Sequence, residues 1–193
     1  TLVVETLYGE KRLPRQTVLA ERCRSCKTKK MACYDELLGE DGTDCGDGRM
    51  EGVRRLEAMT PDERFRFWQG ELSRCIRCNA CRNVCPACSC EKCVFDNPAS
   101  GVENKAAANS FEENLFHIIR AFHVAGRCTD CGECSRVCPQ HIPLHLLNRK
   151  LIADMNELYG PYQAGADLES RPPLMDFRFD DPEPSTARRG GAQ

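Results

Sequence analysis

The sequence predicts a mainly α-helical fold, in which helices flank and connect two copies of one cysteine run. The runs occupy residues 75–86 and 128–139. The spacer between the runs carries apolar residues at helical spacing, as do the stretches before the first run and after the second. Strand-like patterning is confined to residues 1–20. Helices rather than strands should therefore connect the two runs.

Each run has the form C-x2-C-x2-C-x3-C-P, which is the arrangement that holds cubane iron–sulfur clusters. Three cysteines spaced two residues apart wrap one face of a cube within a single tight loop. The fourth is displaced by the longer gap and by a proline, which fixes φ and removes a donor, so it serves the other cluster. We therefore expect two [4Fe-4S] clusters with crossed ligation, the first on Cys75, Cys78, Cys81 and Cys138 and the second on Cys128, Cys131, Cys134 and Cys85.

Two zinc sites or a disulfide framework are the alternative explanations of these runs. Zinc is usually held by two separated ligand pairs, not by four evenly stepped cysteines closed by a proline. Disulfides need an oxidising compartment, and the N-terminus has neither the basic region nor the long apolar region of a secretion signal. The odd total of 15 cysteines also argues against a closed disulfide scaffold. Clusters in a reduced, cytoplasmic protein are favoured.

Seven cysteines lie outside the two runs, too many for buried free thiols to explain them all. Cys23 and Cys26 form one C-x2-C pair, and Cys90 and Cys93 form another. Two such pairs, far apart in sequence, can close a four-sulfur site for zinc or for an iron–sulfur cluster. We expect a third [4Fe-4S] cluster, or Zn, on these four cysteines, with Cys88, Cys33 and Cys45 as alternates.

Composition and motifs narrow the function classes. The net charge of −2 gives no reason to expect a nucleic-acid partner. No stretch has the apolar length needed to span a membrane. The sequence also lacks a phosphate-binding glycine loop, a dinucleotide fingerprint, a nucleophile elbow and an H-E-x-x-H motif. We expect no catalytic site in this chain, which fits a non-catalytic subunit of a larger complex.

Residues 1–59 are expected to form an N-terminal extension that carries the extra cysteines. Its first 13 residues contain two short apolar stretches around Gly9 and Glu10, which predicts a β-hairpin. Residues 39–52 are rich in Gly and Asp and predict a loop. This loop lacks the residue order of an EF-hand, so no calcium site is expected.

Three amphipathic helices frame the runs in residues 60–160. The first begins at a capping box between Thr60 and Glu63, with Pro61 at its first position. The second begins at Ser110 and ends at Gly126, and the third lies between Pro143 and Gly160. The expected buried stripes are Phe65, Trp68 and Leu72; then Phe111, Leu115, Ile118, Ile119 and Phe122; then Leu144, Leu147, Leu151, Met155 and Leu158.

The remaining features carry weaker signals. His117, His123, His141 and His145 are expected to be ordinary surface or core residues, with His141 close enough to the second run to hydrogen-bond there. Residues 161–193 lose the helical periodicity and are rich in proline, which predicts an extended C-terminal arm.

The second run in its context, Gly126-Arg-Cys-Thr-Asp-Cys-Gly-Glu-Cys-Ser-Arg-Val-Cys-Pro-Gln-His-Ile-Pro-Leu144, resembles the α-helical ferredoxin module. That module occurs in the iron–sulfur subunits of succinate dehydrogenase and fumarate reductase, and in the small subunit of heterodisulfide reductase. The first run with its continuation, Cys85-Pro-Ala-Cys88-Ser-Cys90, is similar to the sulfhydrogenase β subunit and the anaerobic sulfite reductase A subunit. The resemblance covers residues 60–160.

This resemblance implies an α-helical ferredoxin fold with two [4Fe-4S] loops related by a pseudo-twofold axis. It also implies a role in relaying single electrons between a flavin- or cluster-containing partner and a catalytic subunit. The complex would be an anaerobic oxidoreductase of the hydrogenase, formate dehydrogenase or heterodisulfide reductase type. The alternative is a structural module, stapled by clusters or zinc, that senses oxygen or redox state. Arginines beside the cysteines would raise the cluster potentials: Arg74, Arg77, Arg82, Arg127 and Arg136.

Overall fold

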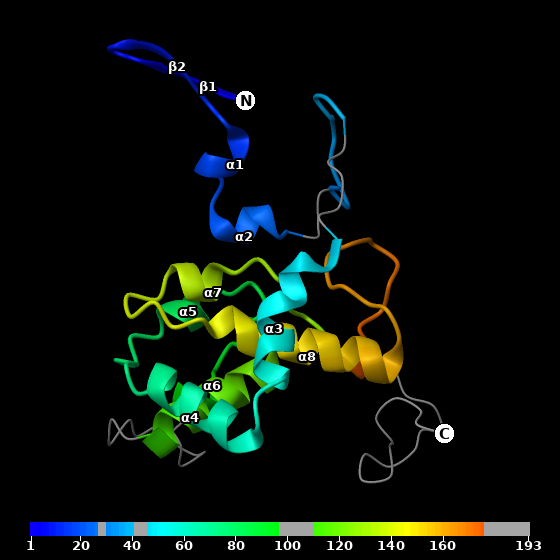
Figure 1. Ribbon diagram of the computed structural model, residues 1–193. Coiled ribbons are helices and arrows are strands. Elements are labelled where there is room, and N and C mark those ends of the chain that lie inside the picture. The colour runs from blue at the N-terminus through cyan, green and yellow to red at the C-terminus, as the bar shows by residue number, and fades with distance from the viewer. Residues whose placement is uncertain (27–29, 41–45, 97–109, 176–193) are drawn as a thin grey trace.

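The computed structural model describes residues 1–26, 30–40, 46–96 and 110–175. Within these ranges the protein is mainly α-helical with one two-stranded sheet (Figure 1). No described helix is both long and apolar enough to cross a membrane. In chain order the elements are β1 (Leu2–Thr6), β2 (Gly9–Leu13), α1 (Arg15–Val18), α2 (Glu21–Arg24), η1 (Gly46–Met50), α3 (Glu51–Glu57), α4 (Pro61–Leu72), α5 (Ala80–Asn83), η2 (Val94–Asp96), α6 (Ser110–His123), α7 (Glu133–Arg136), α8 (Leu144–Tyr159) and η4 (Pro173–Met175).

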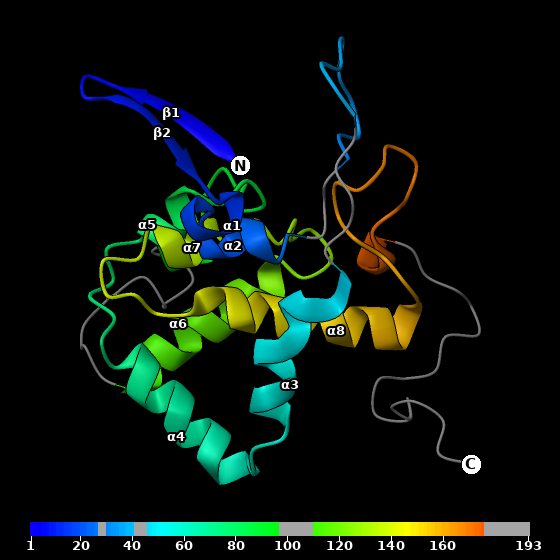
Figure 2. The same cartoon turned by 45° about the horizontal axis from the view of Figure 1, so that its top comes forward.

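The predicted hairpin is confirmed at the N-terminus. Strands β1 and β2 pair antiparallel, with Leu2 opposite Leu13 and Thr6 opposite Gly9. Gly9 has a φ of 106°, which only glycine adopts without strain, so it allows the tight reversal. Figures 1 and 2 both show the hairpin projecting from the helical part of the molecule. Leu7, at its tip, is fully exposed.

Helix α4 begins as the sequence predicts. The Thr60 hydroxyl accepts from the Glu63 amide at 3.3 Å, and the Glu63 carboxylate accepts from the Thr60 amide at 2.9 Å. Leu72 and Trp68 pack in the central core. Phe65, expected on the same stripe, is 61% exposed, and that part of the prediction is wrong. The core surrounds the cysteine loop that follows Leu72, and Phe65 lies about 10 Å back along the helix.

Helix α6 has the predicted position but a different buried face. Phe111, Ile118 and Phe122, expected in the core, are exposed. The buried residues of the helix are instead mixed in character. They are Glu113, Phe116, His117, Arg120 and Ala121. The helix is turned toward the cysteine loops, so polar side chains that interact with those loops are buried in place of apolar ones. The predicted Ser110 side-chain cap lies outside the described side chains.

Helix α8 lies across the molecule beside α6, α7 and α3 (Figures 1 and 2). Its expected stripe is partly correct, because Leu144 and Met155 are buried and Leu147 packs against the core. Leu158, however, is 47% exposed at the free end of the helix. The helix ends at Gly160, as predicted, with a φ of 91°.

The segment before α4 is more ordered than its composition indicates. Residues 46–52, expected as loop, form η1 and the start of α3. Val53 and Leu56 of α3 are buried, and Gly52 faces Leu146 of α8 so closely that a Cβ would lie 2.7 Å from the leucine Cδ2. Tertiary packing therefore overrides the weak helix propensity of this segment. Residues 41–45 and 176–193 of the predicted loop and arm lie outside the described residues; residues 161–175 are irregular apart from η4.

Candidate metal centres

The two cysteine loops share one backbone conformation. Arg77 in the first loop and Asp130 in the second have φ of 53° and 58°, and the amide of each donates to the sulfur of the first cysteine of its run at 3.4 Å. The residue before the following short helix is also left-handed, Asn79 at 61° and Gly132 at 71°. These turns curl each loop so that its backbone amides approach the sulfurs. The sequence repeat is thus also a structural repeat.

The first loop opens into a pocket that receives one cysteine from the second run. Cys75, Cys78 and Cys81 line it from residues 75–81, and Cys138 lines it from beyond α7. Cys81 is buried in α5, whereas Cys78 is exposed. Ile142 and Leu144 close the inner wall and are both almost fully buried.

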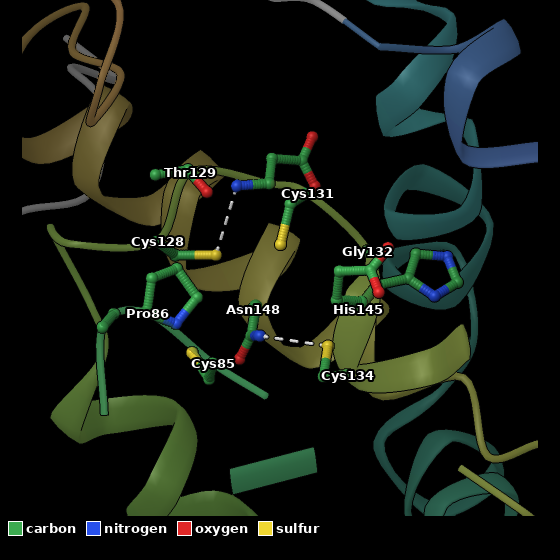
Figure 3. A pocket seen from close by; sticks show the side chains of 12 residues that line it. Cys85, Pro86, Cys128, Thr129, Cys131, Gly132, Cys134, His145 and Asn148 are labelled. Atoms are coloured by element: carbon green, nitrogen blue, oxygen red, sulfur yellow. Dashed lines mark hydrogen bonds between the residues drawn. The ribbon is translucent and has the colours of Figure 1, made fainter. Parts of the chain in front are cut away.

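The second loop forms the matching pocket. Its four cysteine side chains point toward one another (Figure 3). Cys128, Cys131 and Cys134 come from the second run, and Cys85 comes from the end of the first. The Asn148 side chain of α8 reaches the same pocket and donates to Cys134 Sγ at 3.6 Å.

The fold therefore brings together the two sets of four cysteines that crossed ligation requires. None of the described cysteines forms a disulfide. Four thiols around a pocket, with backbone amides directed at sulfur, are the donor set that a [4Fe-4S] cluster uses. The residues present fit that group, while ligation by these eight cysteines stays a prediction.

Burial dominates the acid–base properties of the thiols. It raises the pKa of Cys81 to about 11 and that of Cys128 to about 12, and it also raises the pKa of Cys134 and Cys75. These four thiols are therefore protonated at neutral pH in the metal-free protein, whereas the neighbouring Cys88 thiol lowers the pKa of Cys85 to about 5. Metal binding must release these protons, which couples loading of the pockets to pH.

His117 contacts a cysteine sulfur, a role that the sequence analysis did not assign to it. Its Nε2 lies 3.2 Å from Cys75 Sγ. Burial, with smaller effects of Arg120 and Arg77, lowers the pKa of His117 to about 3, so the ring is neutral at physiological pH. With its proton on Nε2, the ring donates to the Cys75 sulfur. His117 was expected to be an ordinary residue; its helical spacing from Glu113 and Arg120 was the available signal.

Arg120 interacts with cysteines of both pockets. Its Nη2 donates to the Cys81 carbonyl at 3.0 Å, and the side chain is 4% exposed. Burial alone would lower its pKa, but cysteines from both runs, including Cys81 and Cys134, raise it. A permanent positive charge is therefore held among the cysteines of both pockets.

Two further arginines form ion pairs with Asp130 of the second loop. Arg49 and Arg149 contact opposite oxygens of the Asp130 carboxylate, at 3.0 and 2.7 Å, and all three side chains are nearly fully buried. Arg49 also donates to Gln163 Oε1, and Gln163 in turn donates to the Cys128 carbonyl. This clasp, defined as Arg49, Asp130, Arg149 and Gln163, joins η1, the second loop, α8 and the segment after α8.

The first loop is held by a different contact. The Arg77 guanidinium lies 4.2 Å from the ring centroid of Phe116 and donates to the Glu112 carbonyl. Glu113 is buried nearby, and its pKa is raised by that burial. Of the other arginines expected to face the cysteines, Arg82 pairs with Asp96 at 2.7 Å, and Arg136 forms an exposed pair with Glu133.

The cysteines of the expected third site are only partly gathered. Cys90 and Cys93 line one cavity together with the alternate Cys88. Cys23 and Cys26 are not among its lining residues; α2, which holds Cys23, is joined to α7 by the Arg22–Glu133 ion pair at 3.1 Å. Cys33 is exposed, and Cys45 lies outside the described residues. Among the described residues, no three His, Cys, Asp or Glu side chains are placed to hold a single metal ion.

The sequence of this chain is similar to those of known dehydrogenase subunits. The chain is 32% identical over 110 residues to the F420-dependent formate dehydrogenase subunit beta of Methanocaldococcus jannaschii, covering 57% of this chain and 28% of that protein. It is 33% identical over 107 residues to subunit beta of F420-dependent formate dehydrogenase 1 of Methanococcus maripaludis, covering 55% and 26%. It is also 33% identical over 99 residues to the succinate dehydrogenase iron–sulfur subunit of Bacillus subtilis, covering 49% and 39%.

The chain spans between about a quarter and two fifths of the length of these curated relatives. The family model of the 4Fe-4S dicluster domain matches residues 71–142. That range begins at the end of α4, includes both cysteine runs and ends just before α8. The central part of this chain is therefore a ferredoxin-type 4Fe-4S dicluster domain.

Proposed function

We propose that this chain is an electron-transfer subunit of a cytoplasmic dehydrogenase complex, and that it relays single electrons between a flavin- or cluster-containing partner and a catalytic subunit. The observation that carries the proposal is the crossed pair of four-cysteine pockets. Each run contributes its fourth cysteine to the other pocket, so the two sites are built into one rigid unit. A [4Fe-4S] cluster supplies reversible one-electron chemistry.

The remainder of the domain supports that role by placing a buried cysteine in each pocket and a buried positive charge beside them. Cys81 and Cys134 are buried, whereas Cys78 and Cys131 are exposed, and Arg120 interacts with cysteines of both pockets. The Arg120 charge favours the more negative, reduced form of a cluster on either side.

The relatives indicate the type of complex. Two of them are beta subunits of F420-dependent formate dehydrogenases and one is the iron–sulfur subunit of succinate dehydrogenase. We infer that the catalytic partner is a dehydrogenase of the formate dehydrogenase type, with no nucleic-acid partner.

The test is purification of the protein and its partners without oxygen. We expect a larger catalytic subunit to co-purify, and we expect reversible EPR signals from [4Fe-4S] clusters that are reduced by the substrate of that subunit. Recovery of a monodisperse monomer with full cluster content would contradict the subunit role. Zinc in place of iron, or clusters that no redox partner reduces, would favour the structural or sensing module instead.

A further inference from the structure

A third cavity, of about 450 Å³, lies between residues 82–96 and helix α6. Cys88, Cys90 and Cys93 line it, and so does Arg120, which also interacts with cysteines of the other two pockets. The dicluster motif uses none of these three cysteines. They come from one short segment, spaced C-x-C-x2-C, so that a single turn of chain presents three thiols to one space.

This segment is held in place by several contacts. The Cys88 amide donates to the Cys85 carbonyl at 3.0 Å, and the Asp96 amide donates to the Cys93 carbonyl at 2.9 Å. Phe95, in η2, is buried with its ring 4.9 Å from that of Phe116. The cysteine-bearing turn is therefore anchored at both ends against the core.

The lining of the cavity is built for an anionic ligand. Arg82, Arg120 and Arg127 line it, against two acidic residues. One of those acids, Asp96, is already paired with Arg82 at 2.7 Å. Arg120 is 4% exposed, and its Nε has no hydrogen-bond partner in the described part of the chain. A buried guanidinium N–H without a partner is costly, and a negatively charged ligand in the cavity would satisfy it.

We propose that this cavity holds a third [4Fe-4S] cluster, bound by Cys88, Cys90 and Cys93. No three His, Cys, Asp or Glu side chains of the described residues are placed to hold a single metal ion, which argues against zinc in this cavity. A cubane core on three thiolates carries a net negative charge, which matches the arginines. Three cysteines leave the fourth iron of the cluster without a cysteine ligand. The imidazole of His123 lines the cavity and is the candidate for that fourth position. The proposal rests on the electron-transfer function, because it lengthens the same path.

The position of Cys88 indicates the order in which electrons would pass through the three cluster sites. Cys88 follows Cys85, which lines the second pocket, by three residues, and the Cys88 amide donates to the Cys85 carbonyl at 3.0 Å. A cluster on Cys88 therefore lies beside the second pocket. Electrons would then pass from the first site to the second and on to the third, or in reverse.

The test compares two double variants of the full chain, purified without oxygen. The wild-type protein should contain about twelve iron and twelve sulfide ions, as three [4Fe-4S] clusters require. The C90A/C93A variant should lose about a third of both. The matched C23A/C26A variant removes the other C-x2-C pair, which does not line the cavity, and should lose none. A C90A/C93A variant with unchanged iron, a C23A/C26A variant that loses a third, or a wild type with about eight iron ions would overturn the proposal.

A second measurement covers the case in which C90A/C93A does not fold. Cys90→Ser keeps the size of the side chain and should shift the EPR signal and the midpoint potential of one cluster only. Signals identical to those of the wild type would overturn the proposal. Three clusters that no dehydrogenase partner reduces would instead contradict the electron-transfer function while leaving the third site in place, so the two failures are distinguishable.

Discussion

At the scale of the residue, His117 and Asn148 each donate to one cysteine sulfur, but in different pockets. His117 approaches Cys75 in the first pocket, and Asn148 approaches Cys134 in the second. Hydrogen bonds to ligand sulfurs stabilise the reduced cluster and raise its potential. With a cluster in each pocket, these two side chains would allow the two cluster potentials to be adjusted independently.

We expect His117→Phe to lower the midpoint potential of the first cluster alone, by roughly 60 mV for each tenfold loss of preference for the reduced form. Asn148→Leu should act on the second cluster alone, and less strongly because its contact is longer. EPR-monitored redox titration of both variants measures this. Equal shifts of both signals in either variant would contradict the separate assignment.

Arg120 differs from His117 and Asn148, because its single charge interacts with cysteines of both pockets. Arg120→Met keeps most of the volume but removes the charge, and we expect both midpoint potentials to fall together. Arg136→Met is the matched control, since Arg136 lies in a cysteine run but forms an exposed pair with Glu133. Redox titration should show little change in the control, and a shift of only one signal in Arg120→Met would place the charge at a single cluster.

At the scale of the element, α6 shows how function changes a buried face. Its apolar residues predicted a conventional stripe, yet Phe111 and Phe122 are exposed, while His117 and Arg120 are buried. The buried polar residues interact with a sulfur and with a backbone carbonyl of the cysteine loops. Those interactions offset the cost of burying polar groups, so the helix is oriented by its contacts with the cysteine loops rather than by its apolar pattern.

Helix α4 depends on its N-terminal cap. Thr60→Ala removes the side-chain acceptor of the capping box, and we expect a loss of about 1 kcal/mol in the free energy of unfolding at neutral pH. The hydrogen bonds from Thr60 lower the pKa of Glu63 from its ordinary value of 4.5. A lowered carboxylate pKa stabilises the fold above pH 4.5, and this contribution is lost as the pH falls through the folded-state pKa.

The difference between wild type and Thr60→Ala should therefore shrink in acid. Urea unfolding at pH 7 and near pH 3, on protein handled without oxygen, gives the two values. An equal difference at both pH values would show that the Thr60 hydroxyl does not stabilise the ionised Glu63 carboxylate.

At the scale of the whole molecule, the clasp of Arg49, Asp130, Arg149 and Gln163 joins segments that are far apart in sequence. Removing the shared anion leaves two buried guanidinium groups without their partner. We expect Asp130→Asn to cost about 3–5 kcal/mol in the free energy of unfolding. The second cluster should also be lost first, because Asp130 belongs to its loop.

An exposed pair between α3 and α8 provides the control. Lys150 contacts Glu57 at 2.5 Å, with both side chains more than a third exposed. Glu57→Gln should cost no more than about 1 kcal/mol. Urea unfolding and iron analysis measure both variants. If Asp130→Asn were no less stable than Glu57→Gln, the clasp would not hold the second loop.

Local chemistry made part of this structure predictable. The spacing of the cysteines identified the dicluster domain, because ligand spacing in a tight loop is a local property. The Thr60 cap, the Gly160 helix end and the hairpin were predictable for the same reason. The third metal site was predicted from the number and spacing of the remaining cysteines, and its ligands stay a prediction.

Long-range contacts decided the rest. The buried face of α6, the helix at residues 51–57 and the clasp depend on side chains that meet only after the chain has folded. The same holds for the cavity shared by Cys88, Cys90 and Cys93. The sequence by itself determined that two repeated loops would present eight cysteines. Only the tertiary structure decided which charges surround them, because the energy of a buried arginine depends on all the groups packed around it.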